Sequence, residues 1–234
     1  MKIILEFVAT VLIADFVSGL IHWLEDAYGR EDWPIIGRLV TRPNILHHHD
    51  PRYFTGHTWL HSSWDLMCLA AVVVAGAWVM GLLTWQVWCF AVLGANANQI
   101  HKWAHRSASE NGPLIHLLQT LRLIQTPRHH AKHHADPKNS HYCVITDFLN
   151  PVLDAVGFFG LLERCVWVLF GVRRRVDTSI HSTSRQQAEF RNPEHIRTSN
   201  LKLRLDTNDH EFMPGNGAAR QGEEPKDFEP LMGR

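Results

Sequence analysis

The chain alternates between long apolar runs and polar segments rich in histidine. Residues 3–21 form the first apolar run, interrupted only by Glu6 and Asp15. Residues 66–83 form a second run without a charged residue, and 85–100 form a third. A run of about 18 or more apolar residues has the length needed to cross a bilayer. The pattern therefore predicts one membrane helix followed by a helical hairpin.

The first apolar run, within residues 1–24, has one alternative, which is a secretory signal peptide. The small-residue cleavage site that such a peptide needs is replaced here by GLIHWLEDAYG. We therefore expect a signal anchor or a first transmembrane helix. A carboxylate inside a span is costly, so Asp15 is expected to face protein rather than lipid.

The polar segment 22–63 is broken into short pieces by Pro34, Pro43 and Pro51. A short amphipathic stretch at 113–124 is typical of a helix that lies in the membrane interface. The apolar segment 152–172 carries three charged residues, and it can span, re-enter or lie in the interface.

These patterns together predict an all-α integral membrane protein with about four apolar segments. Residues 1–172 are expected to form the membrane-embedded domain. From residue 173 to 234 the chain is mostly polar, which predicts a disordered tail that carries no chemistry. The isolated tail histidines are expected to be solvent-exposed; they are His181, His195 and His210.

Composition narrows the class further. The 23 basic residues balance 23 acidic ones, so the basic bias that a nucleic-acid partner needs is absent. The nine tryptophans agree with a membrane protein, because this residue gathers at membrane interfaces. The 17 histidines against three tyrosines point to metal chemistry, since neutral imidazole is the commonest side-chain metal ligand.

The hairpin brings both histidine-rich segments, 22–63 and 101–150, to the same membrane face. Arginine occurs in the first segment and both arginine and lysine occur in the second, whereas the hairpin turn 81–84 has neither. The positive-inside rule then places the histidine face in the cytoplasm. The membrane would be the bacterial inner membrane, or the endoplasmic reticulum in a eukaryotic cell.

The spacing of the histidines indicates a metal site. Two pairs of side chains lie four positions apart and can share one helix face, His22 with Asp26 and His101 with His105. The tract HHAKHH contains an HxxHH pattern. Nine side chains are candidate ligands: His22, Asp26, His47, His48, His101, His105, His130, His133 and His134. One zinc ion needs three or four ligands, so nine candidates suggest two metal ions. Many nitrogens without clustered thiolates suit iron, zinc or copper.

The histidines also have possible roles other than metal binding. The tract TPRHHAKHHAD at 126–136 can be a solvated loop, although Asp136–Pro137 more simply ends a helix that carries the histidines. Two other histidines, His49 and His116, are expected to be ordinary polar residues. The remaining grouped histidines can support the ligands as outer partners; they are His57, His61, His129 and His141.

The position of the candidate ligands favours one chemistry. They occur where the apolar helices would leave the bilayer, so a site there could receive a lipid chain from the membrane and electrons and O2 from the cytoplasm. A zinc hydrolase usually has a single set of three ligands and a general base. The pattern therefore favours a membrane oxidase of C–H bonds, without a catalytic residue separate from the metal ligands.

Five motifs in this order resemble one known family, the Kua or CarF-type lipid desaturases. The motifs are GLIHWLEDAYG, LHHHDP, NQIHKWAH, HHAKHH and YCVITDFLN, and the resemblance covers about residues 8–165. The family includes plasmanylethanolamine desaturases and a plant plastid enzyme that desaturates the palmitate of phosphatidylglycerol. The step Asp50–Pro51 and His57 are more similar to the plasmanylethanolamine branch.

The resemblance implies a non-haem enzyme with two iron ions that uses O2 and an external electron donor, such as a cytochrome b5-like or ferredoxin-like protein. The family's essential residues would correspond to the same eight histidines and Asp26. The expected substrate is a membrane phospholipid with a 1-O-alkyl ether chain, and the product is a vinyl ether. Three alternatives stay open: an acyl-chain desaturase or hydroxylase, a zinc-dependent membrane hydrolase, and a non-catalytic metal-binding membrane protein.

Overall fold

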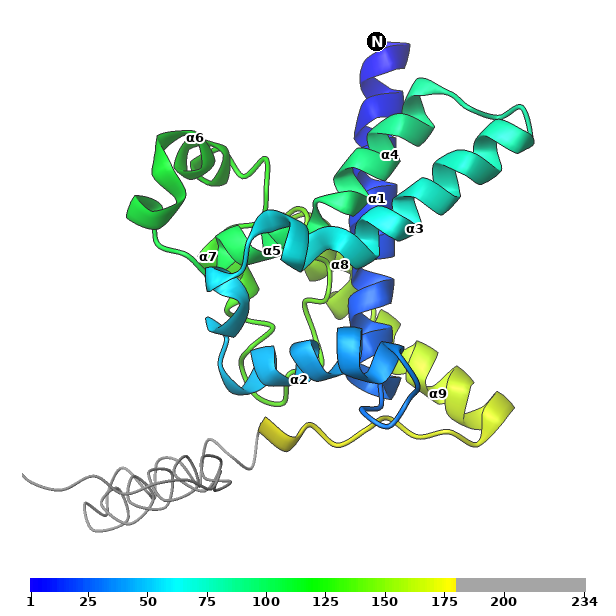
Figure 1. Cartoon of the computed structure of the whole chain (residues 1–234), viewed down its shortest axis with the longest axis vertical. Helices are drawn as coiled ribbons and strands as arrows, with labels where there is room; N and C mark the ends of the chain where they lie inside the picture. The colour runs from blue at the N-terminus through cyan, green and yellow to red at the C-terminus, as the bar shows by residue number, and fades with distance from the viewer. Residues whose placement is uncertain (180–234) are drawn as a thin grey trace, which may run out of the picture. The chain divides into compact units, whose positions relative to one another are not determined.

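Two long apolar helices frame the protein, α1 (Lys2–Tyr28) and α3 (Trp59–Val79). The computed structural model describes residues 1–179, and within them these are the two helices long and apolar enough to cross a membrane. With 27 residues, α1 is about 40 Å long. Helix α4 (Trp85–Ala95) runs back beside α3 and packs against the N-terminal half of α1, whereas α3 diverges from α1 (Figure 1).

The outer surface of this helical hairpin is apolar. Trp78 and Val79 near the end of α3 are 70% and 79% exposed, and Trp88 of α4 is also exposed. A contiguous apolar surface of this kind is rarely left to water, so it agrees with a position in lipid. The run 85–100 is not one continuous helix, because it breaks at Asn96, and α4 alone is only about 16 Å long.

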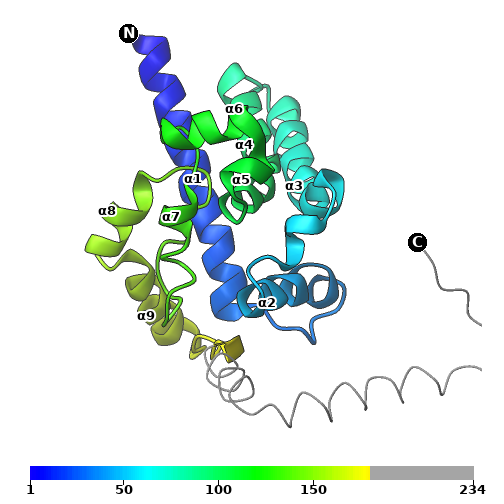
Figure 2. The ribbon, with the colours of Figure 1, turned by 90° about the vertical axis from the view of Figure 1, so that its left-hand side faces the viewer.

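Short helices gather around the C-terminal half of α1, as Figures 1 and 2 show. After a π-helical turn (Gly37–Thr41) come α2 (Arg42–His49) and a 3-10 turn (Tyr53–Gly56). Helix α5 (Ala97–Ala104) continues from α4, α6 (Ala108–Thr120) is kinked at Gly112, and α7 is Pro127–His130. The all-helical class is confirmed for the described residues, which contain no strand.

An extended segment, residues 140–146, packs along α1 and fixes its position. The carboxylate of Asp15 is fully buried and accepts hydrogen bonds from the backbone N–H groups of Ile145 and Thr146 and from the Thr146 hydroxyl. A side chain at position 19 would collide with Cys143, whose sulfur would lie 2.6 Å from the added carbon. The prediction that Asp15 faces protein is confirmed, because its charge needs these donors.

The segment 152–172, which the sequence left open, forms α8 (Leu149–Ala155) and α9 (Phe158–Phe170). Gly157 separates them in a left-handed conformation. Helix α9 is about 20 Å long, shorter than the hydrocarbon core of a bilayer, and Phe159 packs against Trp23 of α1. Its length therefore does not support a complete span.

The chain just beyond the predicted domain boundary at residue 172 still contacts the helices. The backbone N–H of Arg175 donates to the carbonyl of Ala27 at the end of α1, and Asp177 reaches a histidine of α2. Residues 173–179 therefore pack with the helical domain. The rest of the predicted tail, with its three histidines, lies outside the described residues.

Candidate metal centre

The nine candidate ligands lie on four separate pieces of chain. His22 and Asp26 are on the last turns of α1, and His47 and His48 end α2. The other five come from α5 and its end, and from α7 and the turns after it; they are His101, His105, His130, His133 and His134. The fold brings all nine together in two adjacent groups.

The first group, here called the five-histidine group, contains His47, His101, His105, His130 and His134. Its ligand atoms all lie within 4.8 Å of one another. The Nε2 atoms of His101 and His130 are 2.8 Å apart, and those of His130 and His134 are 3.1 Å apart. The Nε2 atoms of His105 and His101 are separated by 3.3 Å.

These separations fit nitrogens that share one ion. Two nitrogens each about 2.1 Å from one metal lie roughly 3.0–3.4 Å apart at tetrahedral or octahedral angles. Both ring nitrogens of His47 are buried and have no hydrogen-bond partner among the described residues. A buried polar atom without a partner is rare in a folded protein, so a ligand such as a metal ion would account for it.

The second group, here called the aspartate group, contains His22, Asp26, His48 and His133, all buried. The carboxylate of Asp26 lies 3.2 Å from Nε2 of His48 and 3.4 Å from Nε2 of His133. Nε2 of His22 is 3.7 Å from the same carboxylate. Three imidazoles and one carboxylate form a donor set that suits iron or zinc.

The outer nitrogens of the aspartate group are held by hydrogen bonds. Nδ1 of His22 lies 3.0 Å from the carbonyl oxygen of Tyr142, and Nδ1 of His133 lies 2.8 Å from that of Ser140. Nδ1 of His48 lies 3.0 Å from the carboxylate of Asp177. When each Nδ1 donates a proton in this way, the Nε2 lone pair faces the group, as in many metal sites.

Asp177 is the residue that sequence reasoning missed. It follows the arginine run 173–175, in a segment whose polar composition predicts a disordered tail. Its carboxylate also accepts hydrogen bonds from the backbone and hydroxyl of Ser179. No spacing signal in the sequence links Asp177 to His48, because 129 residues separate them.

Burial and mutual repulsion keep the five-histidine group neutral. Burial lowers the pKa of His47, His101 and His130 well below the usual value, and the neighbouring imidazoles add to this. The pKa of His105 falls to about 3 for the same reasons, burial first. Neutral imidazoles have free lone pairs, so protons would not compete with a metal ion near neutral pH.

His48 differs because two carboxylates face it. Burial alone would lower its pKa, but Asp26 and Asp177 outweigh burial and raise the pKa to about 9. Burial would raise the pKa of Asp177, yet the hydrogen bonds with His48 and Ser179 lower it instead. The carboxylates thus make the aspartate group a site for positive charge, which a bound cation would supply.

The HxxHH pattern does not lie on one helix as predicted. Helix α7 ends at His130, and the following turns are closed by bonds such as that from the His133 N–H to the His130 carbonyl. As a result, His133 joins the aspartate group while its neighbour His134 joins the five-histidine group. His47 and His48 are divided between the groups in the same way.

The other histidines fall outside both groups. His129 lies 3.2 Å from the side chain of Asn150, and His141 pairs with Asp154 at 2.6 Å. The rings of His57 and His61 meet edge to face with centroids 4.5 Å apart. None of these four histidines is a member of either group in the part of the chain that the structure describes.

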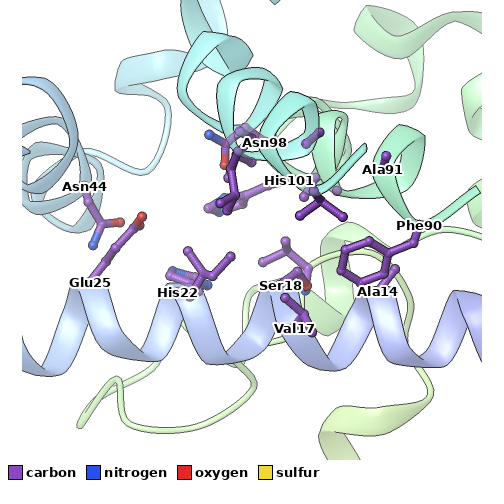
Figure 3. A pocket seen from close by; sticks show the side chains of 18 residues that line it. Ala14, Val17, Ser18, His22, Glu25, Asn44, Phe90, Ala91, Asn98 and His101 are labelled. Carbon is purple, nitrogen blue, oxygen red and sulfur yellow. The ribbon is translucent and has the colours of Figure 1, made fainter. Parts of the chain in front are cut away.

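An apolar cavity of about 240 Å³ leads from α3 and α4 to the two groups (Figure 3). Leu66, Phe90 and Val17 are among its lining residues. The same cavity is lined by His22 of the aspartate group and His101 of the five-histidine group. A ligand in this apolar cavity would therefore touch one residue from each group.

A second cavity, of about 310 Å³, adjoins the first and has a mixed lining that is more polar than that of the first. The two cavities share four lining residues, which are Glu25, Asn44, Asn98 and His101. The further residues that line only the second cavity include Arg38, His57, His61 and Asp65. We call the two spaces the apolar cavity and the polar cavity.

Comparison with known proteins identifies the family. Residues 11–177 match the family model described as lipid desaturase domain. Plasmanylethanolamine desaturase 1 of Mus musculus is 34% identical over 75% of this chain and 69% of its own length. Plasmanylethanolamine desaturase of Myxococcus xanthus is 34% identical over 71% of the chain and 61% of its own length.

A plant protein, chloroplastic fatty acid desaturase 4 of Arabidopsis thaliana, is 30% identical over 79% of the chain and 58% of its own length. The chain thus spans less than two thirds of the bacterial and plant relatives. No solved structure matches the chain. A match over residues 11–177, together with the two buried histidine groups, shows that this chain belongs to the lipid desaturase family.

Proposed function

We propose that the protein is an O2-dependent di-iron desaturase that converts a 1-O-alkyl ether phospholipid, plasmanylethanolamine, to its vinyl ether. The observation that carries this proposal is the apolar cavity, which is lined by His22 from one group and His101 from the other. An alkyl chain in this cavity would lie against both groups. The plasmanylethanolamine desaturases among the relatives support the choice of lipid.

The position of the two histidine groups along α1 and α3 supports oxidation of the lipid chain near its glycerol end. Along α3, the cavity lining changes from polar at His61 and Asp65 to apolar at Leu66 and beyond. Along α1, the apolar lining at Val17 and Ile21 gives way to His22 and Glu25. The candidate ligands lie at this change, where the chain of a bound phospholipid would meet its polar part. A vinyl ether forms at the two carbons next to the ether oxygen, which is this part of the lipid.

The nine residues of the two groups would hold two iron ions, which supply the reduction of O2 and an oxidant for C–H bonds. The overall reaction takes O2, two electrons, two protons and CH2–CH2 to CH=CH and two waters. The electrons would come from a cytochrome b5-like or ferredoxin-like donor on the cytoplasmic side. The apolar wall formed by Val17, Leu66 and Phe90 would position the chain and exclude water.

A second candidate is the desaturation of an acyl chain in a phospholipid, with the same groups and the same cavity. The chloroplastic fatty acid desaturase among the relatives favours it. The two candidates differ in whether an ether or an ester joins the chain to glycerol. They also differ in the carbons that are oxidised, because the first carbon of an acyl chain is a carbonyl carbon without hydrogen.

The test is a lipid analysis of cells that express the chain and receive a 1-O-alkyl glycerol, grown with and without air. An acid-labile vinyl ether that appears only with air is the expected result. A new double bond in an acyl chain, without a vinyl ether, would favour the second candidate. Unchanged lipids in both conditions, with a suitable electron donor co-expressed, would contradict both and favour a zinc hydrolase or a non-catalytic metal protein.

A further inference from the structure

The polar cavity begins where the apolar cavity ends, and the proposed function leaves it without an occupant. Both spaces are lined by His101, Asn98, Asn44 and Glu25, so they meet at the candidate metal centre. The polar cavity extends from there to the π-helical turn and the first turns of α3. Its volume of about 310 Å³ lies within the range of small-molecule sites.

The residues beside the polar cavity indicate that it would lie at the level of the lipid headgroups. The first turns of α3 carry Trp59 and Trp64, both exposed, and tryptophan favours the membrane interface. Asp65 comes next in the helix and lines the polar cavity, whereas Leu66 and Leu69 line the apolar one. A phospholipid with one chain in the apolar cavity would therefore place its headgroup in the polar cavity.

The charges of the polar cavity are of both signs. Arg38 supplies one cation and Asp65 one carboxylate, and Glu25 adds a second carboxyl group. An anionic headgroup could place its phosphate near Arg38 but would bring no positive group to Asp65. A zwitterionic headgroup would place its phosphate near the cation and its ammonium near the carboxylates.

The charged side chains are available for such a ligand. Within residues 1–179, neither Arg38 nor Asp65 forms an ion pair, although one oxygen of Asp65 accepts the backbone N–H of Leu66. Asp65 is half-buried and Arg38 is exposed, so the cation lies toward the cavity's outer end. A charge-assisted hydrogen bond from an ammonium to a half-buried carboxylate is among the stronger polar contacts.

We propose that the polar cavity binds the headgroup of the substrate lipid, a phosphate ester that carries a primary ammonium. Arg38 and His61 bind the phosphate, and Asp65 with Glu25 binds the ammonium. The assignment rests on the proposed function in one respect, which is that the apolar cavity holds the lipid chain. It adds a selectivity for ethanolamine phospholipids over anionic ones.

The experiment measures lipid binding separately from turnover. The iron-loaded protein is placed in nanodiscs that contain equal amounts of alkyl-linked ethanolamine and glycerol phospholipids, and the lipids that stay bound after transfer to detergent are measured by mass spectrometry. We expect the wild-type chain to enrich the ethanolamine lipid. Asp65→Asn should reduce that enrichment about tenfold, the size of a lost charge-assisted contact. Arg38→Gln should weaken binding of both lipids by a similar factor, because both carry phosphate.

Two matched variants act as controls. Asp32→Asn and Arg122→Gln remove the same charges at exposed positions that line neither cavity, so they should bind lipids as the wild type does. Iron content is measured for every variant, and an unchanged value shows that the fold is intact. If Asp65→Asn folds, loads iron and keeps the full ethanolamine enrichment, the headgroup assignment is wrong.

Further results distinguish the headgroup assignment from a site for a soluble compound and from the proposed reaction. Soluble glycerophosphoethanolamine should displace the bound lipid only at much higher concentration; displacement at equal concentration would indicate a site for a soluble compound instead. If the wild type enriches ethanolamine lipid but desaturates no lipid in air with a donor, the headgroup site stands and the proposed reaction fails. If the wild type desaturates lipid without headgroup selectivity, the proposed reaction stands and the headgroup assignment fails.

Discussion

The two histidine groups lie side by side but are held in different ways. In the aspartate group, the outer nitrogens of His22, His133 and His48 each have a hydrogen-bond partner, two of them backbone carbonyls. In the five-histidine group, Nδ1 of His130, Nδ1 of His134 and both nitrogens of His47 have none within the described chain. One group is fixed by hydrogen bonds and the other by packing.

Packing in the five-histidine group includes an aromatic contact. The ring of Phe54 lies with its centroid 4.6 Å from that of His47 and 5.0 Å from that of His101.

The aspartate group differs further because it contains the one carboxylate among the nine candidates, whose charge attracts a cation. Partners that orient a ligand imidazole raise metal affinity, so we expect the aspartate group to hold its metal more tightly.

The largest effect should follow the loss of a ligand from the five-histidine group. His130→Ala removes an imidazole whose Nε2 is 2.8 Å from that of His101 and 3.1 Å from that of His134. We expect turnover to fall by about a thousandfold or more, because the chemistry depends on a metal that is lost. Product formation by the purified protein and iron content per chain are the measurements.

The control for this variant is His116→Ala, at an exposed position on α6. It should leave both quantities unchanged. If the iron content of His130→Ala falls to about half, the aspartate group keeps its own ion and the two groups bind metal independently. Full activity of His130→Ala would remove the five-histidine group from the proposed reaction.

The next largest effect concerns the carboxylate that sequence reasoning missed. Asp177→Asn keeps the size of the side chain but removes the charge that faces Nδ1 of His48. Loss of such a partner typically costs about 10–100-fold in metal affinity or activity. Metal affinity of the aspartate group, measured by competition with a chelator, should fall by that factor, whereas Asp32→Asn should have no effect. An unchanged affinity would show that residues 173–179 cover the site without supporting it.

A smaller effect is expected from graded removal of metal. When chelator concentration is raised stepwise, the five-histidine group should release its ion at about tenfold lower chelator than the aspartate group. A two-step loss of iron, followed by spectroscopy on wild type and on Asp177→Asn, tests this order. Release of both ions in a single step would mean that the hydrogen-bonded partners give the aspartate group no advantage.

The smallest effect should come from a residue distant from both groups. Asp15→Asn leaves one acceptor oxygen where the carboxylate now accepts three hydrogen bonds from Ile145 and Thr146. We expect a loss of about 1–3 kcal/mol in stability, the usual cost of an unsatisfied buried polar group. Thermal unfolding in detergent measures the change. Because the same segment carries the Tyr142 carbonyl that faces His22, the two groups should release iron at more similar chelator concentrations than in the wild type.

The sequence by itself determined much of this protein. Hydrophobic run lengths predicted the helical class and the two long apolar helices, since the length of a span is set by the thickness of the bilayer. Asp15 was predicted to face protein because a lone charge in lipid is too costly. The nine candidate ligands are the nine residues that the fold gathers, although their role as ligands stays a proposal.

Only the tertiary structure decided how these residues are divided. Helical spacing relates residues three and four apart, but it does not say that His133 and its neighbour His134 belong to different groups. That division depends on turns after α7, which bring the two side chains to opposite sides. The contacts of Asp177 with His48 and of Tyr142 with His22 join positions more than 100 residues apart. Local sequence patterns do not predict such contacts, because the contacts form only when separate helices pack. The same packing makes the two cavities that meet at the candidate metal centre.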